Sequence, residues 1–394
     1  MKKLIIILLL ILSQICFAGI DTTQTTSLTG FHTFLRNFVA IAKADGINDA
    51  VIHEHLLKAR YSLLVIAKDS HQPEFSLSYD DYMRLFVTPN RIQQGKLFYT
   101  KHRVLVNQIS REYGVQPQYL VAILGVETNY GQTMGTYPVI SALATLAYID
   151  RRHEFFKREL LAALHMLQDR QVGENRLLGS WAGAMGQCQF MPDLYMNYAV
   201  AYRKSGLANI WYNSADALAS TANFFHQQGW IDKEETAVHI RIPVNFPLAD
   251  IGPDSKKTVL EWQQLGIKNY DNQSSLPNWQ GPTMIILASD STDHAYLVNS
   301  NFNVLMRWNA SYLYALAVNK LAMDIVHEDK IKPIKFIVPS LSQQPTKTII
   351  IAPQPETLLD RLNFLNIQLS QARQKFLHFF FYPNLVNEIK IISK

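Results

Sequence analysis

Between Gly30 and Trp230, apolar residues recur every three or four positions, and this spacing constrains the fold more than any other feature of the chain. The spacing is clearest in one segment, at Phe156, Leu160, Leu164 and Leu167. It places apolar side chains on one face of an α-helix, and Gly, Pro and Asn residues separate the successive segments. We therefore expect a mainly helical structure over this range. One helix should be capped by Asn213 and end at Gly229.

The chain after Trp230 shows a different pattern. Residues 236–243 alternate between apolar and polar side chains, as in a half-buried strand. Residues 283–289 and 294–299 flank an Asp-Ser-Thr-Asp turn, which predicts a hairpin. Helical spacing returns over residues 311–326. We interpret residues 235–300 as a small β-containing insertion in an otherwise helical chain.

The charge and the cysteine content exclude several classes of protein. The chain has 394 residues, of which 48% are hydrophobic and 18% charged, and its formal net charge is +5. This near balance argues against a nucleic-acid-binding protein, which usually carries a concentrated basic surface. Cys16 and Cys188 are the two cysteines, so the chain has neither a disulfide framework nor a cysteine-rich metal site.

The N-terminus has the order of a secretory signal peptide. Two lysines precede an apolar run at residues 4–12, which is too short to span a bilayer because a spanning helix needs about 20 residues. Cys16 and Ala18 occupy the small-residue positions of a cleavage site before Gly19. We expect residues 1–18 to be removed on export. The alternatives are a retained membrane anchor and a lipid-modified Cys16.

Residues 117–131, PQYLVAILGVETNYG, form the most informative segment. Its proline suits the first turn of a helix, and apolar residues three, four and seven positions before Glu127 place this carboxyl on the apolar face. Such a carboxyl is either a structural group, paired with an arginine or capped by a neighbouring helix, or lies in a cleft with a raised pKa. The second environment suits a general acid for a glycosidic oxygen. Spacing alone leaves both alternatives open.

Residues 179–192, GSWAGAMGQCQFMP, form a second candidate site. Three glycines allow the backbone to approach another group closely, and Ser180, Gln187 and Gln189 offer neutral hydrogen-bonding groups. These groups suit a sugar ligand. A glycine-rich segment is also typical of a tight helix–helix crossing, which is what we expect from this segment taken alone.

Taken together, five motifs resemble the lytic murein transglycosylase B family of bacterial cell-wall enzymes. They are GVETNYG at 125–131, ALATLAYIDRR at 142–152, GSWAGAMGQCQFMP at 179–192, ANFFHQQGW at 222–230 and NFNVLMRWNASYLYALAV at 301–318. The resemblance covers residues 31–326 and favours the catalytic alternative for Glu127. It implies a mainly α (α+β) fold, with a lysozyme-like helical catalytic domain and a small inserted β-containing subdomain.

These observations divide the chain into five expected parts. They are a signal peptide (1–18), a helical lysozyme-like catalytic region (19–234), a β-containing insertion (235–300), a return helix that completes the core (301–330) and a C-terminal extension of unknown role (331–394). Within the extension, residues 356–379 have the spacing of an amphipathic helix.

The resemblance also implies a role for individual residues. Glu127 matches the family's single catalytic acid and base, and Ser180 matches a serine that hydrogen-bonds the N-acetyl group of the muramoyl sugar. The other matching positions are Gln189 and Phe190, which line the cleft, Arg151 and Arg152, which lie near the stem peptide, and Asn309 and Tyr314, which face Glu127.

Three features depart from the family pattern. Trp308 and Phe224 stand where the best-known members have tyrosines, so we expect stacking to survive but one hydroxyl hydrogen bond to be lost at each position. Some members carry an EF-hand-like calcium loop. Here residues 201–207 place two cations among the ligand positions, and only Asp216 remains of the expected carboxylates. Because Ca²⁺ requires several negatively charged oxygen ligands, we expect no metal site.

The implied reaction is cleavage of the β-1,4 bond between N-acetylmuramic acid and N-acetylglucosamine in peptidoglycan, with 1,6-anhydro-muramoyl ends as product and no cofactor. The alternatives are a hydrolytic muramidase and a non-catalytic peptidoglycan-binding scaffold. The expected partners are glycan strands in the periplasm and, through association, the cell envelope or other wall enzymes. We expect a monomer that does not bind nucleic acid.

Overall fold

The computed structural model describes residues 28–69, 77–149, 152–169, 172–173, 177–203 and 206–327. The chain divides into two compact units, Met1–Asp329 and Lys330–Lys394, and all the described residues belong to the first. The predicted signal peptide, Arg151 and the helix predicted over residues 356–379 lie outside the described residues.

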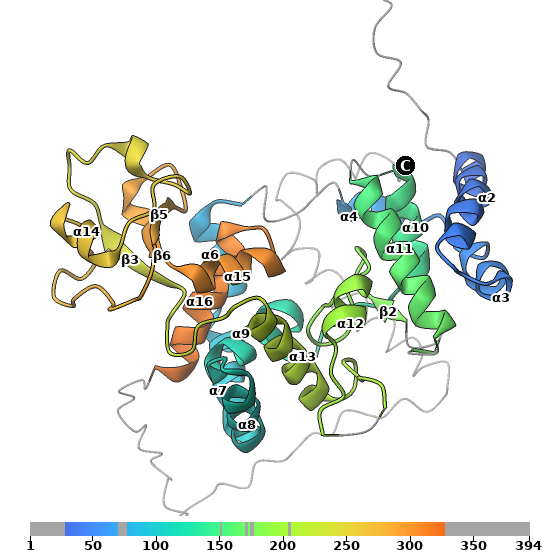
Figure 1. Ribbon diagram of the computed structural model, residues 1–394, viewed down its shortest axis with the longest axis horizontal. Helices are drawn as coiled ribbons and strands as arrows, with labels where there is room; N and C mark the ends of the chain where they lie inside the picture. The colour runs from blue at the N-terminus through green and yellow to red at the C-terminus, as the bar shows by residue number, and fades with distance from the viewer. Residues whose placement is uncertain are drawn as a thin grey trace, which may run out of the picture. The chain divides into compact units, whose positions relative to one another are not determined.

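The first unit is mainly helical, as Figure 1 shows. Before the insertion its helices are α2 (Leu28–Ala44), α3 (Asp49–Val51), α4 (Leu63–Asp69), α6 (Tyr79–Phe86), α7 (Pro89–Lys101), α8 (Arg103–Tyr113), α9 (Pro117–Thr128), α10 (Val139–Ile149), α11 (His153–Gln168), α12 (Pro192–Tyr198) and α13 (Ser214–Gln227). A π-helical turn, η1 (Ile52–Leu56), follows α3. The short strands β1 (Tyr137–Pro138) and β2 (Leu178–Gly179) pair antiparallel.

Helix α9 forms the centre of the helical core. It packs against α7, α8, α13 and α16 (Tyr312–Val326). Its predicted start at Pro117 is confirmed. The sequence predicted one buried apolar face, but in the structure residues 119–126 are all buried, so every side of the helix is covered. A helix enclosed by four others needs apolar residues on every side rather than on one face.

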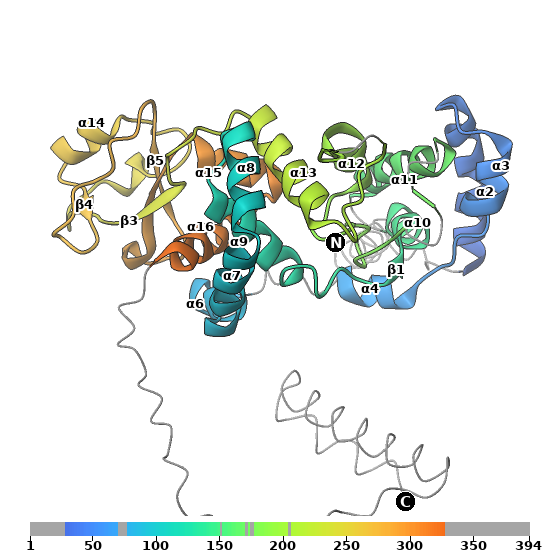
Figure 2. The same ribbon diagram turned by 90° about the horizontal axis from the view of Figure 1, so that it is seen from below.

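The predicted insertion contains a four-stranded sheet of β3 (Ala237–Arg241), β4 (Lys268–Asn269), β5 (Met284–Leu287) and β6 (Ala295–Val298). The strand order is β4-β3-β6-β5, and each neighbouring pair is antiparallel. The predicted hairpin is confirmed, with Ile286 of β5 opposite Tyr296 of β6. The segment also holds α14 (Val259–Gln264) and the 3₁₀ turns η3 (Leu248–Asp250) and η4 (Thr292–His294). Figure 2 shows α14 beside the sheet.

The sheet is buried on both faces. Met284, Ile286 and Val298 belong to the large helical core. Ile285 and Leu297, which alternate with them, belong to a second cluster around Trp262 of α14. Successive side chains of a strand point to opposite faces of the sheet. One face of this sheet therefore packs against the helical core, and the other face forms a separate core with α14.

The caps confirm the predicted helix boundaries near the site. The Asn213 side chain accepts a hydrogen bond from Ala215 N, and Gly229, just past the end of α13, has a positive φ of 81°. The chain then returns through α15 (Ser300–Trp308) to α16, where the Ser311 side chain accepts from Tyr314 N. This arrangement of helices and a small sheet confirms the predicted fold class.

Candidate active site

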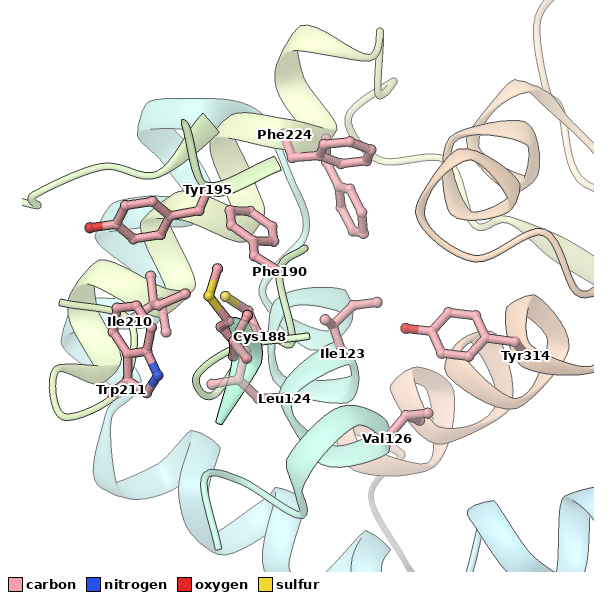
Figure 3. Close-up of a cluster of buried hydrophobic side chains, with 14 of the residues drawn as sticks. Ile123, Leu124, Val126, Cys188, Phe190, Tyr195, Ile210, Trp211, Phe224 and Tyr314 are labelled. Carbon is pink, nitrogen blue, oxygen red and sulfur yellow. The ribbon is translucent and has the colours of Figure 1, made fainter. Parts of the chain in front are cut away.

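Glu127 lies at the C-terminal end of α9 and is partly exposed. Its Oε1 accepts a hydrogen bond from Trp308 Nε1 at 2.8 Å and another from Tyr314 Oη at 2.5 Å. Trp308 is the last residue of α15 and Tyr314 lies in the first turn of α16. The turn between these helices therefore places two uncharged donors on one carboxyl oxygen. Figure 3 shows the Tyr314 hydroxyl pointing from α16 toward α9.

The chain turns sharply directly after Glu127. Residues 129–131 all have positive φ, at 49°, 61° and 85°, a region that residues other than glycine rarely adopt. Thr128 Oγ1 donates to Gln187 O at 2.7 Å and accepts from Gly131 N at 2.9 Å. The end of α9 is thus tied both to its own turn and to the segment 179–192.

The segment 179–192 folds back on itself, so the expected helix–helix crossing is wrong. Gly183 and Gly186 adopt positive φ values of 89° and 67°. A Cβ at Gly179 would lie 2.2 Å from Ala184 O, and one at Gly186 would lie 2.7 Å from the Ile210 side chain. The glycines are required because a tight turn brings backbone against backbone.

Ser180 and Gln189 are held by the backbone of this turn, and both are partly exposed. Ser180 Oγ accepts from Ala184 N at 3.1 Å, and Ser180 N donates to Ala184 O at 2.7 Å. Gln189, with φ of 52°, donates from Nε2 to Met134 O and Gly186 O. These bonds use the Ser180 oxygen as an acceptor and the Gln189 amide as a donor, so the hydroxyl proton and the amide oxygen can make further hydrogen bonds.

The rings of Phe190 and Phe224 do not face a cleft, which corrects the predicted role of both residues. Their exposures are 0% and 2%, and their centroids lie 5.3 and 5.2 Å from the Trp308 ring. Phe225, absent from the predicted site, contacts the same ring at 5.4 Å. Figure 3 shows Phe190 and Phe224 among the buried side chains of this cluster. Their role is to support Trp308, since a ring packed on several sides by aromatic edges has a restricted orientation.

Position 308 keeps a side-chain hydrogen bond although it has no hydroxyl group. An indole carries one N–H donor, and in Trp308 this group bonds the Glu127 carboxyl at 2.8 Å. The prediction considered only the lost hydroxyl group and not this N–H donor. At position 224 the phenylalanine ring is buried, so its surroundings are those of a core residue.

The remaining predicted residues lie in different settings. Arg152 Nη2 is 3.3 Å from Asp69 Oδ1, and its guanidinium lies 5.1 Å from the Phe156 ring centroid. Asn309 follows Trp308 and is partly exposed, with its backbone N donating to Leu305 O. The structure therefore joins Glu127, Trp308 and Tyr314 directly. It places Ser180 and Gln189 on the segment tied to α9.

Two further groups bear on the chemistry. Cys188 is fully buried, and burial raises the pKa of its thiol to about 12, which makes it unsuitable as a nucleophile. Asp216 accepts hydrogen bonds from Tyr202 N at 3.0 Å and Asn209 N at 2.8 Å, so backbone donors occupy its carboxylate. Across the described ranges, no group of three or more His, Cys, Asp or Glu side chains could hold a metal ion.

Residues 30–323 match the family described as the transglycosylase SLT domain. The chain belongs to this family. The match spans nearly the same residues as the resemblance noted in the sequence, 31–326, so the predicted family is confirmed. The mainly helical structure with its small sheet is thus the family's fold. The solved relatives named below share this fold at 35% sequence identity or less.

Individual relatives agree with this assignment. Membrane-bound lytic murein transglycosylase B of Escherichia coli K12 is 35% identical over 245 residues, which cover 62% of this chain and 66% of that protein. The chain thus spans just under two thirds of this relative. SltB3 of Pseudomonas aeruginosa, solved in complex with NAG-anhNAM-pentapeptide, has a TM-score of 0.70 and 35% identity, covering 75% of this chain and 79% of that one. Escherichia coli Slt35, solved with calcium, has a TM-score of 0.63 and 30% identity over 78% and 95% of the two chains.

Proposed function

We propose that this chain is a lytic transglycosylase that cleaves the β-1,4 bond between N-acetylmuramic acid and N-acetylglucosamine in peptidoglycan. The observation that carries the proposal is the setting of Glu127, a partly exposed carboxyl at a helix end whose Oε1 accepts from two uncharged donors. Membership of the transglycosylase SLT domain family supports it. So does the SltB3 structure, in which a relative binds an anhydro-muramoyl peptide.

In the proposed mechanism one carboxyl performs both proton transfers. Glu127, protonated, donates its proton to the glycosidic oxygen, and the bond between that oxygen and C1 of the muramoyl sugar breaks. The acetamido oxygen of the same sugar, held by the Ser180 hydroxyl, stabilises the positive charge that develops at C1. Glycosidases that use water or a covalent intermediate instead pair two carboxyl groups.

The second step needs no water. Glu127, now a carboxylate, takes the proton of the C6 hydroxyl of the muramoyl sugar, and O6 attacks C1 to close the 1,6-anhydro ring. The proton returns Glu127 to its starting form, so the cycle balances without a cofactor. An intramolecular nucleophile has a high effective concentration, which lets it compete with bulk water.

We assign substrate recognition to the other predicted site residues. Gln189 and Asn309 offer neutral hydrogen bonds to sugar hydroxyl and amide groups, and the partly exposed Trp308 offers an aromatic edge. Arg152, and Arg151 beside it in the sequence, would recognise the carboxylates of a stem peptide. Phe190 and Phe224 contribute by holding Trp308 rather than by touching the glycan.

The products released from purified sacculi test this proposal. A lytic transglycosylase releases muropeptides with anhydro ends, which are lighter by one water than those of a hydrolytic muramidase. The muramidase alternative predicts reducing ends, and a non-catalytic scaffold predicts binding without release. Either of the last two results, obtained with folded protein, would refute the proposal.

We further propose export to the periplasm as a monomer, in association with the envelope. Support comes from the basic and apolar N-terminal residues and from the Escherichia coli relative, which is named as membrane-bound. None of the described helices combines the length and the apolar character needed to cross a bilayer. N-terminal sequencing of protein from the envelope fraction should find a chain that begins at or near Gly19. Retention of Met1, or a lipidated Cys16 as the first residue, would refute this cleavage site.

A further inference from the structure

Trp308 and Tyr314 donate to the same oxygen of Glu127. The indole Nε1 lies 2.8 Å from Oε1, and the phenol oxygen lies 2.5 Å from it. A carboxyl oxygen has two lone-pair positions in its plane. With two donors directed at Oε1, both positions are occupied.

The two donors differ in what they permit. A phenol can either donate or accept, so Tyr314 alone would tolerate a proton on Oε1 and accept from it. An indole N–H can only donate. We propose that Trp308 is a positioning residue that holds Oε1 of Glu127 as a hydrogen-bond acceptor and so stabilises the ionised carboxyl more than its acid form. This inference rests on the proposed function, in which Glu127 is the general acid and base.

The packing around Trp308 gives its N–H a defined direction. The indole ring contacts Phe190, Phe224 and Phe225, with centroid distances of 5.3, 5.2 and 5.4 Å and interplanar angles of 50°, 84° and 73°. Phe225 is itself stacked on Trp230 at 4.9 Å and 8°. Rings packed in this way restrict the two side-chain torsions of the indole. The N–H therefore cannot turn away from Glu127 without disturbing several buried rings.

This hydrogen bond has a consequence for the acid step. The bond from Trp308 to Oε1 is strongest while the carboxyl is ionised, because hydrogen bonds to a charged acceptor are the stronger ones. Trp308 should therefore favour the carboxylate form and set the pH above which the acid form is lost.

Two other titratable groups interact with Glu127. Tyr314 shares Oε1, and the buried Cys188 thiol, with its pKa raised to about 12 by burial, lies close enough to sense the charge of Glu127. Ionisable groups on the other helices packed against α9 bond elsewhere. Among them, Arg91 of α7 bonds the carbonyls of Leu85 and Phe86, and Glu112 of α8 accepts from Tyr202. Asp216 of α13 accepts from backbone amides, and Lys320 and Asp324 of α16 pair with each other.

The test replaces only the N–H of Trp308. We would incorporate 3-benzothienylalanine at position 308, which keeps the bicyclic shape and substitutes sulfur for the N–H, and measure kcat/KM against pH on purified glycan strands. The falling limb at high pH should move up by about one pH unit, as expected for one charge-assisted hydrogen bond. Trp308→Phe should move the limb in the same direction, and Tyr314→Phe should do so as well because it removes the other donor.

A matched control uses another buried indole. Trp230 Nε1 donates to the neutral amide oxygen of Gln116 at 2.6 Å, so 3-benzothienylalanine at position 230 removes a hydrogen bond of similar kind without touching a carboxyl. Its falling limb should coincide with that of the wild type. A shift at 308 but not at 230 supports the inference. An unshifted limb in a folded, active protein substituted at 308, or an equal shift at both positions, overturns it.

Failure of the inference about Trp308 can be distinguished from failure of the proposed function. If the wild-type protein releases no anhydro product, the proposed function fails before any variant is measured. If the wild type is active, the position of the falling limb in the substituted proteins tests Trp308 alone.

Discussion

Glu127 on α9 and Glu159 on α11 are both carboxyl groups on helices that face the core, but different kinds of donor hold them. Glu127 is partly exposed and accepts from the side chains of Trp308 and Tyr314. Glu159 is 5% exposed, and its Oε2 accepts from the backbone N–H of Asp193 at the start of α12 at 3.0 Å. Glu159 thus represents the structural alternative for a glutamate on an apolar helix face, a group that caps a neighbouring helix.

The difference shows what burial alone can and cannot indicate. Burial raises the pKa of Glu159 to about 7, partly opposed by the Asp193 N–H, so this carboxyl also has the perturbed titration often taken as a sign of catalysis. The Glu159 carboxyl, however, is bonded to a backbone N–H at the start of a neighbouring helix. Side-chain donors that leave part of a carboxyl exposed, as at Glu127, are the feature that suits a proton-transfer site.

The largest expected effect is on turnover after Glu127→Gln. The amide keeps the shape and can still accept from Trp308 and Tyr314, but it cannot transfer a proton, so the rate should fall by about 10²–10⁴ or more. Stability should hold or increase, because a neutral amide needs no counter-charge. Release of muropeptides and thermal melting measure the two quantities.

The matched control for that prediction is Glu159→Gln, which makes the same chemical change on α11. It should retain turnover, since the amide oxygen can still accept from Asp193 N. Full activity in a folded Glu127→Gln protein would remove the distinction between the two carboxyls. A large loss of stability in that protein would instead indicate a structural ion pair, whose disruption costs about 3–5 kcal/mol when buried.

A second prediction concerns the pH dependence of stability between pH 4.5 and 7, to which Glu159 should contribute strongly. Its pKa rises from the ordinary 4.5 to about 7 in the folded protein. Between these values the folded state holds a proton that the unfolded state has released, so the free energy of unfolding falls as pH rises through this window. At 1.36 kcal/mol per pKa unit the decrease amounts to about 3 kcal/mol.

Glu159→Gln has no proton to release and should lose that part of the slope. Urea unfolding of both proteins at several pH values between 4.5 and 7 measures the difference. Parallel stability curves for the wild type and the variant would show that Glu159 does not titrate in this window.

The smallest expected effect concerns Asp216, a third acid that bonds to backbone. Because its carboxylate accepts from Tyr202 N and Asn209 N, and cations stand in the neighbouring loop sequence, it should not recruit Ca²⁺. Adding Ca²⁺ or a chelator should leave the melting temperature unchanged, since a ligand specific for the folded state would raise it. A rise of several degrees with Ca²⁺ would contradict this prediction.

Local signals in the sequence predicted much of this fold. Pro117 marked the start of α9, Asn213 capped α13, and the Asp-Ser-Thr-Asp turn between residues 283–289 and 294–299 predicted the β5–β6 hairpin. Each depends on residues close together in the chain, where helix caps, turn residues and periodicity act.

Contacts between residues far apart in the chain could not be predicted from the sequence in this way. The bond from Trp308 to Glu127 joins positions 181 residues apart, and no spacing rule connects them. The burial of Phe190 and Phe224 depends on how α13, α15 and the segment 179–192 meet. An aromatic residue in a motif can equally face a ligand or support a neighbour, and only the packed structure distinguishes these roles.

The central claim is that one carboxyl, Glu127, works with the substrate's own hydroxyl. It is tested most directly by asking whether oxygen from water enters the product. Purified sacculi would be digested by the wild-type protein in H₂¹⁸O, and the released muropeptides would be analysed by mass spectrometry. The account predicts anhydro-muramoyl products that carry no ¹⁸O, because O6 of the sugar is the nucleophile. Reducing ends that carry one ¹⁸O would show that water attacks C1, and would contradict the account.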